Sequence, residues 1–314
     1  MERNLALEFV RVTEAAAVAA SKWVGKGDGK AADKAAVEAM RSCFNDVDID
    51  GTIVIGEGER DEAPMLYIGE KVGTGKGPKI DIAVDPLECT NSVAHGYPNA
   101  ISVFAAGPKG TLLHAPDTYM DKIAVSKAAA GKVHLDNTPK ENIEAVAKAL
   151  GKKAEDVTVM IMDRPRHEKL IKDVREAGAR VRLITDGDVA GAIAPCLQGS
   201  PVDMLLGIGA APEGVIAAAG MKCFDGFFQG RLKPRDDKDR KRIESMGLDP
   251  DKLLEMEDLA KGDNLMFAAT GILEGPLLKG ITLDPIHGLK SHSVIMRSKT
   301  KVIRFLETHR HGGE

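Results

Sequence analysis

The fold is decided by the stretch from Val157 to Met221, which reads VTVMIMDRPRHEKLIKDVREAGARVRLITDGDVAGAIAPCLQGSPVDMLLGIGAAPEGVIAAAGM. Three times in this stretch a short apolar run, typical of a buried strand, is followed by a segment with apolar residues at helical spacing. Such alternation predicts a mixed, mainly parallel sheet and places this half in the α/β class. The three strand–helix units are expected over residues 157–174, 181–197 and 202–221.

The N-terminal half carries a different pattern. Apolar residues at helical spacing predict helices over residues 5–23 and from about Ala31 to Phe44. Short β-like runs follow, and two of them flank a Gly-Pro-Lys-Gly turn, which predicts a hairpin. We expect helices that cover a mostly antiparallel sheet. The expected strands are 52–55, 80–84 and 119–125, and the hairpin comprises 99–106 and 111–114.

The two halves meet after a helix that Pro139 and Gly151 bracket. We predict an N-terminal domain, residues 1–155, with the metal and phosphate site, and a C-terminal domain, residues 156–314, that binds the sugar phosphate. The charged stretch 231–262 is expected to form a solvated helical excursion. Closing strands are expected at 265–269, 293–297 and 301–306, and they could return to the first domain.

The composition argues against several classes of protein. The 314 residues carry a net charge of -4, which does not suit binding to nucleic acid or a membrane surface through bulk charge. The four cysteines are scattered, so a reducing compartment is expected. The first five residues lack the apolar stretch of a signal peptide, and no apolar run reaches transmembrane length. We expect a cytoplasmic protein that binds neither nucleic acid nor membrane.

Carboxylates follow the predicted N-terminal strands. Glu57 comes after the first strand. Asp85 directly follows the run 80–84, and Glu88 comes three residues later, beyond Pro86. Carboxylates that converge at strand ends repel each other unless a cation neutralises them. Oxygen ligands of this kind suit Mg²⁺ or Mn²⁺. Asp85 and Glu88 are therefore metal-site candidates, and Thr90 adds a hydroxyl group close by.

The other acidic residues of this half have competing interpretations. Asp33 shares a helix face with Val37 and Met40, where a carboxylate is costly unless it is paired or linked to a metal. A helix-start residue satisfied by local amides is the equal alternative for Asp33. The acidic loop residues are expected to face water. These are Asp46, Asp48, Glu59, Asp61 and Glu62.

Polar groups also follow the strands of the C-terminal half, where open α/β sheets usually bind ligands. Arg164 and Arg166 flank the rigid Pro165, and guanidinium groups bind phosphate oxygens bidentately. Asp186 and Asp188 follow the second strand and are suited to accept hydrogen bonds from sugar hydroxyls.

The segment after the third strand, GIGAAPEG over residues 207–214, is close to a dinucleotide-binding fingerprint. Pro212 replaces its last glycine, and Glu213 would place negative charge where a pyrophosphate should lie, so a dinucleotide site is not expected. Glu213 is either a helix-start residue that the helix dipole favours or a fifth metal-directed carboxylate, and we favour the latter. The histidines have no ligand spacing and are expected at the surface or in turns: His114, His134, His287, His309 and His311.

Taken together, these segments resemble the class II fructose-1,6-bisphosphatases, members of the metal-dependent, lithium-sensitive phosphatase superfamily. The matching segments run in order from near the first residue to near the last, so the resemblance covers essentially the whole chain. They are Arg11–Glu14, Ala32–Val37, Asp50–Glu59, Asp61–Glu70, Asp85–Glu88, Ala115–Met120, Pro165–His167, Asp186–Asp188, Ala211–Val215 and Met296–Thr300.

The resemblance implies a layered α/β sandwich of the sugar phosphatase type and roles for single residues. It implies metal ligation by Asp33, Glu57, Asp85, Glu88 and Glu213. It implies a catalytic set of Thr90, Asp33 and Glu57, and a loop of Glu88, Cys89 and Thr90 that holds the reacting phosphate. The remaining substrate-binding residues that it implies are Tyr119, Arg164, Pro165, Arg166, Asp186, Gly187, Asp188 and Ala210.

The chain departs from the family pattern at two positions. The family usually has glycine at 89 and tends to have glycine at 210, where this chain has Cys89 and Ala210. A side chain at 89 could crowd the approach of a phosphate to backbone amides. The alternative is a small buried thiol that packs like a hydrophobic residue.

The activity implied is hydrolysis of the 1-phosphate of fructose 1,6-bisphosphate, a gluconeogenic step, with Mg²⁺ or Mn²⁺. Enzymes accelerate such hydrolysis by up to ~10²¹, and general acid–base catalysis supplies only roughly 10²–10⁴, so metal ions must supply much of the rest. One alternative is a phosphatase for sedoheptulose bisphosphate or an inositol phosphate, and another is a non-catalytic sugar-phosphate sensor. We also expect a homo-oligomer, either a dimer or a tetramer.

Overall fold

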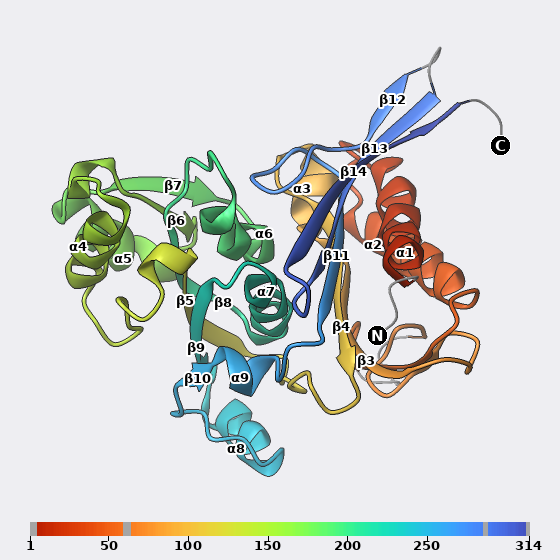
Figure 1. Ribbon diagram of the computed structural model, residues 1–314, viewed down its shortest axis with the longest axis horizontal. Coiled ribbons are helices and arrows are strands. Elements are labelled where there is room, and N and C mark those ends of the chain that lie inside the picture. The colour runs from red at the N-terminus through yellow and green to blue at the C-terminus, as the bar shows by residue number, and fades with distance from the viewer. Residues whose placement is uncertain (1–4, 59–63, 285–287, 312–314) are drawn as a thin grey trace. The chain divides into compact units, whose positions relative to one another are not determined.

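The chain forms two compact units, seen here in a computed structural model that describes residues 5–58, 64–284 and 288–311 (Figure 1). One unit contains Met1–Leu113 and Gly262–Glu314, and the other contains His114–Lys261. The first unit thus combines the two ends of the chain, including the closing strands, whereas the sequence placed a domain boundary at residue 155.

The first unit is built on an eight-stranded sheet in the order β12-β13-β11-β4-β3-β1-β2, with β14 paired along β13. The neighbouring strands are antiparallel except β1 and β3, which run parallel. The strands are β1 (Asp50–Ile55), β2 (Lys71–Val72), β3 (Lys79–Glu88), β4 (Ile101–Pro108), β11 (Met266–Gly271), β12 (Thr282–Asp284), β13 (Gly288–Arg297) and β14 (Val302–Arg310).

The predicted hairpin between 99–106 and 111–114 is wrong. Strand β4 is present, but its partners are β3 on one side and β11 on the other. Because both edges of β4 are occupied by these strands, residues 111–114 have no edge of β4 to join. The chain turns at Pro108, whose carbonyl accepts a hydrogen bond from the amide of Thr111, and residues 111–114 form no strand, only an isolated bridge at Leu112.

Two helices cover one face of this sheet (Figure 1). Helix α1 (Leu5–Ser21) contacts β4, β11 and β13, and helix α2 (Gly29–Phe44) contacts β3. Helix α2 begins where the carboxylate of Asp28 accepts a hydrogen bond from the Ala31 amide, an N-cap of the usual kind. Both helices follow the apolar spacing that predicted them. A short third helix, α3 (Thr90–His95), follows β3.

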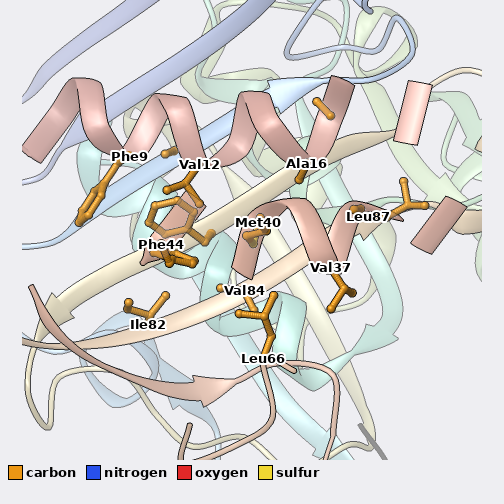
Figure 2. Close-up of a cluster of buried hydrophobic side chains, with 14 of the residues drawn as sticks. Phe9, Val12, Ala16, Val37, Met40, Phe44, Leu66, Ile82, Val84 and Leu87 are labelled. Carbon is orange, nitrogen blue, oxygen red and sulfur yellow. The ribbon is translucent and has the colours of Figure 1, made fainter. Parts of the chain in front are cut away.

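The core of the first unit lies between these helices and the sheet. Figure 2 shows Phe9 and Phe44, from α1 and α2, pointing toward Ile82 and Val84 of β3. Phe104 of β4 is fully buried, and its ring centroid lies 5.1 Å from that of Phe9 and 5.4 Å from that of Phe44. Three aromatic rings from separate elements therefore meet in one packed cluster.

The second unit has a six-stranded mixed sheet in the order β10-β9-β5-β8-β6-β7. The parallel pairs are those of β6 with β7 and with β8, which come from the predicted strand–helix units. Strand β5 pairs antiparallel with β8 and β9, so the other half of the sheet is antiparallel. The strands are β5 (Tyr119–Val125), β6 (Thr158–Met162), β7 (Arg180–Ile184), β8 (Met204–Ala210), β9 (Phe227–Lys233) and β10 (Leu254–Glu255).

The helices of this unit also begin and end at local signals. Helix α4 starts with a capping box between Thr138 and Glu141 and ends at Gly151, which has a φ of 64°. Among the described residues no helix is both long enough and apolar enough to span a membrane. The helices are α4 (Pro139–Leu150), α5 (Glu168–Glu176), α6 (Asp188–Ile193), α7 (Ala211–Cys223), α8 (Asp237–Ser245) and α9 (Met256–Leu259).

We predict that Phe104→Ala lowers the free energy of unfolding by about 3–5 kcal/mol, because it leaves a cavity between two rings that cannot fully collapse. Phe305→Ala is the matched control, since Phe305 is 48% exposed and Phe104 is 0% exposed. Urea unfolding of both variants measures the difference. Equal losses in the two variants would contradict the packing described here.

Candidate active site

The last residues of β3, from Asp85 to Glu88, lead through Cys89 directly into α3, which begins at Thr90. The pairing of β3 with β4 shifts register between Asp85 and Glu88, so β3 carries an extra residue there. The Asp85 carboxylate accepts a hydrogen bond from the Leu87 amide at 3.2 Å, and the Thr90 hydroxyl donates to the Leu87 carbonyl at 3.4 Å. A bulge at a strand end re-aims side chains, and here it lies between the predicted residues Asp85 and Glu88, just before Thr90 begins α3.

Cys89, the residue between β3 and α3, has a strained backbone conformation. Its φ is 79°, in the left-handed region that favours glycine. Its side chain is buried, and the thiol donates a hydrogen bond to the Asn99 carbonyl at 2.9 Å. These contacts correspond to the packing alternative for Cys89.

Glu57 is held by a close backbone contact. A Cβ atom on Gly56 would lie only 2.0 Å from the Leu66 carbonyl oxygen, so the position requires glycine. The Glu57 amide donates to that same oxygen at 3.0 Å. The segment that follows β1 is thereby fixed against Leu66, and the Glu57 side chain is set at the end of the strand.

The charge of Asp33 acts on Glu57. The pKa of Glu57 is raised to about 7, first by burial and then by the nearby negative charge of Asp33. Burial also raises the pKa of Asp33. Asp33 lies on α2, whose first residue, Gly29, packs against Thr90: a Cβ atom on Gly29 would lie 2.9 Å from Thr90 Cγ2. Asp33 and Thr90 thus belong to elements in direct contact.

These carboxylates fit a divalent cation in kind, because oxygen donors suit Mg²⁺ or Mn²⁺ and a cation would relieve the repulsion within the pair. Within the residues that the structure describes, however, no three histidine, cysteine, aspartate or glutamate side chains converge as a metal site. Glu213 belongs to the second unit. The set of five ligands stays a prediction.

In the second unit, Arg166 lies beside Tyr119. Its Nη2 and Nε atoms donate to the Ile208 carbonyl at 2.8 and 3.1 Å, and its guanidinium carbon lies 4.8 Å from the centre of the Tyr119 ring. Arg166 and Tyr119 are both exposed. Two predicted substrate-binding residues, which lie on different elements, are thus brought together.

His167 holds this arrangement, and its role was not anticipated from the sequence. The ring is 1% exposed; Nδ1 lies 2.7 Å from the Met162 carbonyl, and Nε2 accepts a hydrogen bond from the Ile208 amide at 2.7 Å. The ring is therefore neutral with its proton on Nδ1, and burial lowers its pKa. In the sequence, the signal for this role was the position of His167 directly after Arg166, in the loop predicted to bind phosphate.

The predicted sugar contacts after β7 have charged partners. Arg164 Nη2 lies 3.7 Å from Asp186 Oδ2, and burial raises the pKa of Asp186. Gly187, at a φ of 84°, precedes Asp188, the first residue of α6. Asp188 is buried and accepts a hydrogen bond from Lys122 Nζ at 2.6 Å. Lys122 was missed, although its inward place in the alternation of β5 was a signal.

Glu213 opens α7 with a buried carboxylate. Its Oε2 atom is inaccessible and has no hydrogen-bond partner among the described residues. Its pKa is raised to about 7, mainly by burial; the charge of Lys122 opposes this rise and that of Asp188 adds to it. Such an oxygen is costly unless a ligand satisfies it, which fits a metal-directed carboxylate.

The remaining predicted residues have simple surroundings. Pro165 is exposed, and Ala210 precedes α7 at a φ of -79°, which any residue adopts without strain. Asp46 and Asp48 face water as expected. The exposed histidines include His114, His309 and His311, whereas His134 is half-buried. Glu59, Asp61, Glu62 and His287 lie outside the described residues.

Comparison with known proteins gives the family. A family model described as "Bacterial fructose-1,6-bisphosphatase, glpX-encoded" matches residues 3–310. A solved structure of inositol monophosphatase from Anabaena (Nostoc) sp. PCC 7120 is 14% identical, with a TM-score of 0.31 over 61% of this chain and 70% of its own. That similarity is too weak to bear on fold or function.

Two curated relatives match almost the whole chain. The "D-fructose 1,6-bisphosphatase class 2/sedoheptulose 1,7-bisphosphatase" of Synechococcus sp. is 46% identical over 98% of this chain and 96% of its own. The "Fructose-1,6-bisphosphatase 1 class 2" of Escherichia coli is 48% identical over 98% of this chain and 95% of its own. The chain therefore belongs to the family of bacterial class 2 fructose-1,6-bisphosphatases.

Proposed function

We propose that this protein hydrolyses the 1-phosphate of fructose 1,6-bisphosphate to give fructose 6-phosphate and phosphate. The observation that carries the proposal is the pair of Asp33 and Glu57, two partly buried carboxylates whose pKa values are both raised, in a chain of this family. Carboxylates in such surroundings mark functional sites because a stable fold otherwise avoids them. Sedoheptulose 1,7-bisphosphate is the second candidate substrate, because the Synechococcus relative is named for both activities.

The proposed cofactor is Mg²⁺ or Mn²⁺, bound by Asp33, Glu57, Asp85, Glu88 and Glu213. Such an ion, when bound, lowers the pKa of a water molecule and stabilises the charge of the leaving group. The Thr90 hydroxyl would orient the attacking water, and Asp33 and Glu57 would hold its proton. The segment from Asp85 to Thr90 would receive the reacting phosphate, and the backbone at Glu88 and Cys89 would contribute to this phosphate site.

The second unit is proposed to bind the rest of the substrate. Arg164 and Arg166 would hold the non-reacting phosphate, since the two guanidinium groups flank Pro165 and carry five donors each. Tyr119, Asp186, Asp188 and the segments at Gly187 and Ala210 would contact the sugar. The scattered cysteines favour a reducing cytoplasm, and a homo-oligomer remains our expectation.

A phosphate-release assay tests the function directly. We expect fructose 1,6-bisphosphate to be hydrolysed in the presence of Mg²⁺ or Mn²⁺, and hydrolysis to stop when a chelator removes the metal. Restoring the metal should restore turnover. Sedoheptulose 1,7-bisphosphate is the comparison substrate, and an inositol monophosphate, which lacks a second phosphate, is the negative control. Full activity in excess chelator would contradict the metal mechanism, and no activity on any bisphosphate would leave a sugar-phosphate sensor.

Glu57→Gln tests the metal ligand through stability as well as activity. The pKa of Glu57 is raised from 4.5 to about 7, so the native protein binds more protons than the unfolded chain between these values. The stability from this group is present below pH ~4.5 and lost as pH rises through ~7. Without metal, Glu57→Gln should therefore be more stable than wild type at pH 8, by on the order of 1–3 kcal/mol, and about equal at pH 5.

Added Mn²⁺ should reverse this order, because it stabilises only the protein that binds it. Glu38→Gln, an exposed change on α2, is the control and should follow wild type. Thermal unfolding at both pH values measures all three proteins, and an unchanged Mn²⁺ response in Glu57→Gln would exclude Glu57 as a ligand. Phosphate release by Glu57→Gln should be nearly abolished.

Arg166→Ala tests the distal phosphate contact. We expect it to weaken the binding of fructose 1,6-bisphosphate by about 2–5 kcal/mol, because a bidentate charged contact is lost. The binding of p-nitrophenyl phosphate should be weakened far less. Arg182→Ala, an exposed arginine on β7, is the matched control. The ratio of kcat/KM values for the two substrates is the measurement. Equal loss on both substrates would show that Arg166 serves the reacting phosphate or the fold.

A further inference from the structure

Lys122 is a buried lysine in the middle of the second unit's sheet. It lies on β5, between β8 and β9. Its side chain is 1% exposed, and its Nζ atom donates to Asp188 Oδ2 at 2.6 Å. The Asp188 side chain is itself 7% exposed. An ammonium group so far from water persists only with a well-placed counter-charge.

Gly209 leaves the space that this ion pair occupies, and Gly214 lies beside the lysine stem. A Cβ atom on Gly209 would lie 1.8 Å from Asp188 Oδ2 and 3.0 Å from Lys122 Nζ. A Cβ atom on Gly214 would lie 3.5 Å from Lys122 Cε. Gly209 and Gly214 flank the segment that carries Ala210 and Glu213, so the lysine side chain runs alongside the end of β8 and the start of α7.

The ammonium charge also acts on a second carboxylate. The charge of Lys122 acts on Glu213, whose Oε2 atom is buried without a hydrogen-bond partner among the described residues. Lys122 thus acts on two carboxylates, through a hydrogen bond to Asp188 and through its charge on Glu213. Both carboxylates belong to the residues proposed to bind ligand.

We propose that Lys122 is a positioning residue for the sugar of the substrate. Its ammonium group engages Oδ2 of Asp188 and fixes the orientation of that carboxylate, which leaves Oδ1 to accept a hydrogen bond from a hydroxyl group of the sugar bisphosphate. Lys122 acts through Asp188 and does not touch the reacting atoms. The inference rests on the proposed role of Asp188 in sugar binding.

Lys122→Met removes the ammonium group and keeps an unbranched apolar side chain. The matched control is Lys152→Met, because Lys152 Nζ donates to the buried Asp203 at the same distance of 2.6 Å in the same unit. Each variant deprives a buried aspartate of its lysine, so both should lower Tm. Only Lys122 is bonded to a residue proposed to bind sugar.

The readout that separates the two roles is KM against kcat. We expect Lys122→Met to raise KM for fructose 1,6-bisphosphate by about 10–100-fold, with little change in kcat, because a charge-assisted contact is misplaced. Hydrolysis of p-nitrophenyl phosphate, which has no sugar hydroxyl, should change far less when both substrates are assayed at saturating Mn²⁺, which offsets a weaker metal site at Glu213. Lys152→Met should leave the KM and kcat of both substrates unchanged. Lys122→Arg, which retains the charge, should raise KM by a smaller factor than Lys122→Met.

An unchanged KM in folded Lys122→Met would reduce Lys122 to a structural ion pair and overturn the inference, as would an equal loss on both substrates. If the methionine variant does not fold, Lys122→Gln, which loses the charge but can still donate an uncharged hydrogen bond to Asp188, should raise KM for fructose 1,6-bisphosphate by a smaller factor, and an unchanged KM in it would likewise overturn the inference. Failure of the wild type to hydrolyse any sugar bisphosphate would refute the proposed function instead. In that case the test of Lys122 is the rise in Tm that saturating fructose 1,6-bisphosphate causes. If Lys122→Met loses this rise and Lys152→Met keeps it, the inference is supported. If Lys122→Met keeps the rise, the inference is overturned.

Discussion

Carboxylates withdrawn from water impose the main constraint on this protein. In the first unit Glu57 has a pKa of about 7 because of burial and the charge of Asp33. In the second unit burial raises the pKa of Glu213 to the same range, although Lys122 opposes the change. A fold gains no stability from such groups, so each unit gives up stability at the residues that the family resemblance links to ligand binding.

Close backbone contacts keep these side chains in place. Gly56 lets the chain after β1 approach the Leu66 carbonyl, and Gly209 makes room for the Asp188 carboxylate. Cys89 shows the opposite case, because a residue with a Cβ atom is held at a φ of 79° by its neighbours. Ala210, the other departure from the family pattern, has an ordinary backbone conformation and carries no such strain. Of the two departures from the family pattern, only the one at Cys89 therefore involves a strained backbone.

Local signals predicted most of the elements, and tertiary contacts account for the errors. Helix α4 begins and ends where Pro139 and Gly151 indicated, because its caps are formed by residues near in sequence. The hairpin at residue 107 was wrong, because the partner on one edge of β4 is β11, more than 150 residues away in the sequence. For the site residues, too, signals near in sequence led to predictions, and contacts distant in sequence were missed. Arg166 and Asp188 were predicted from strand ends, whereas Lys122 was missed because its partner Asp188 lies 66 residues further on.

The ring of His167 has a consequence for the mechanics of the second sheet. Strands β6 and β8 are paired only at Val159–Met204 and Met160–Leu205, and beyond these residues the Ile208 amide bonds to the imidazole in place of a neighbouring strand. The two strands can therefore diverge toward the Arg166 loop without leaving a backbone donor unsatisfied. Hydrogen exchange at the Ile208 amide consequently reports how firmly a side chain, rather than a strand, closes that end of the sheet.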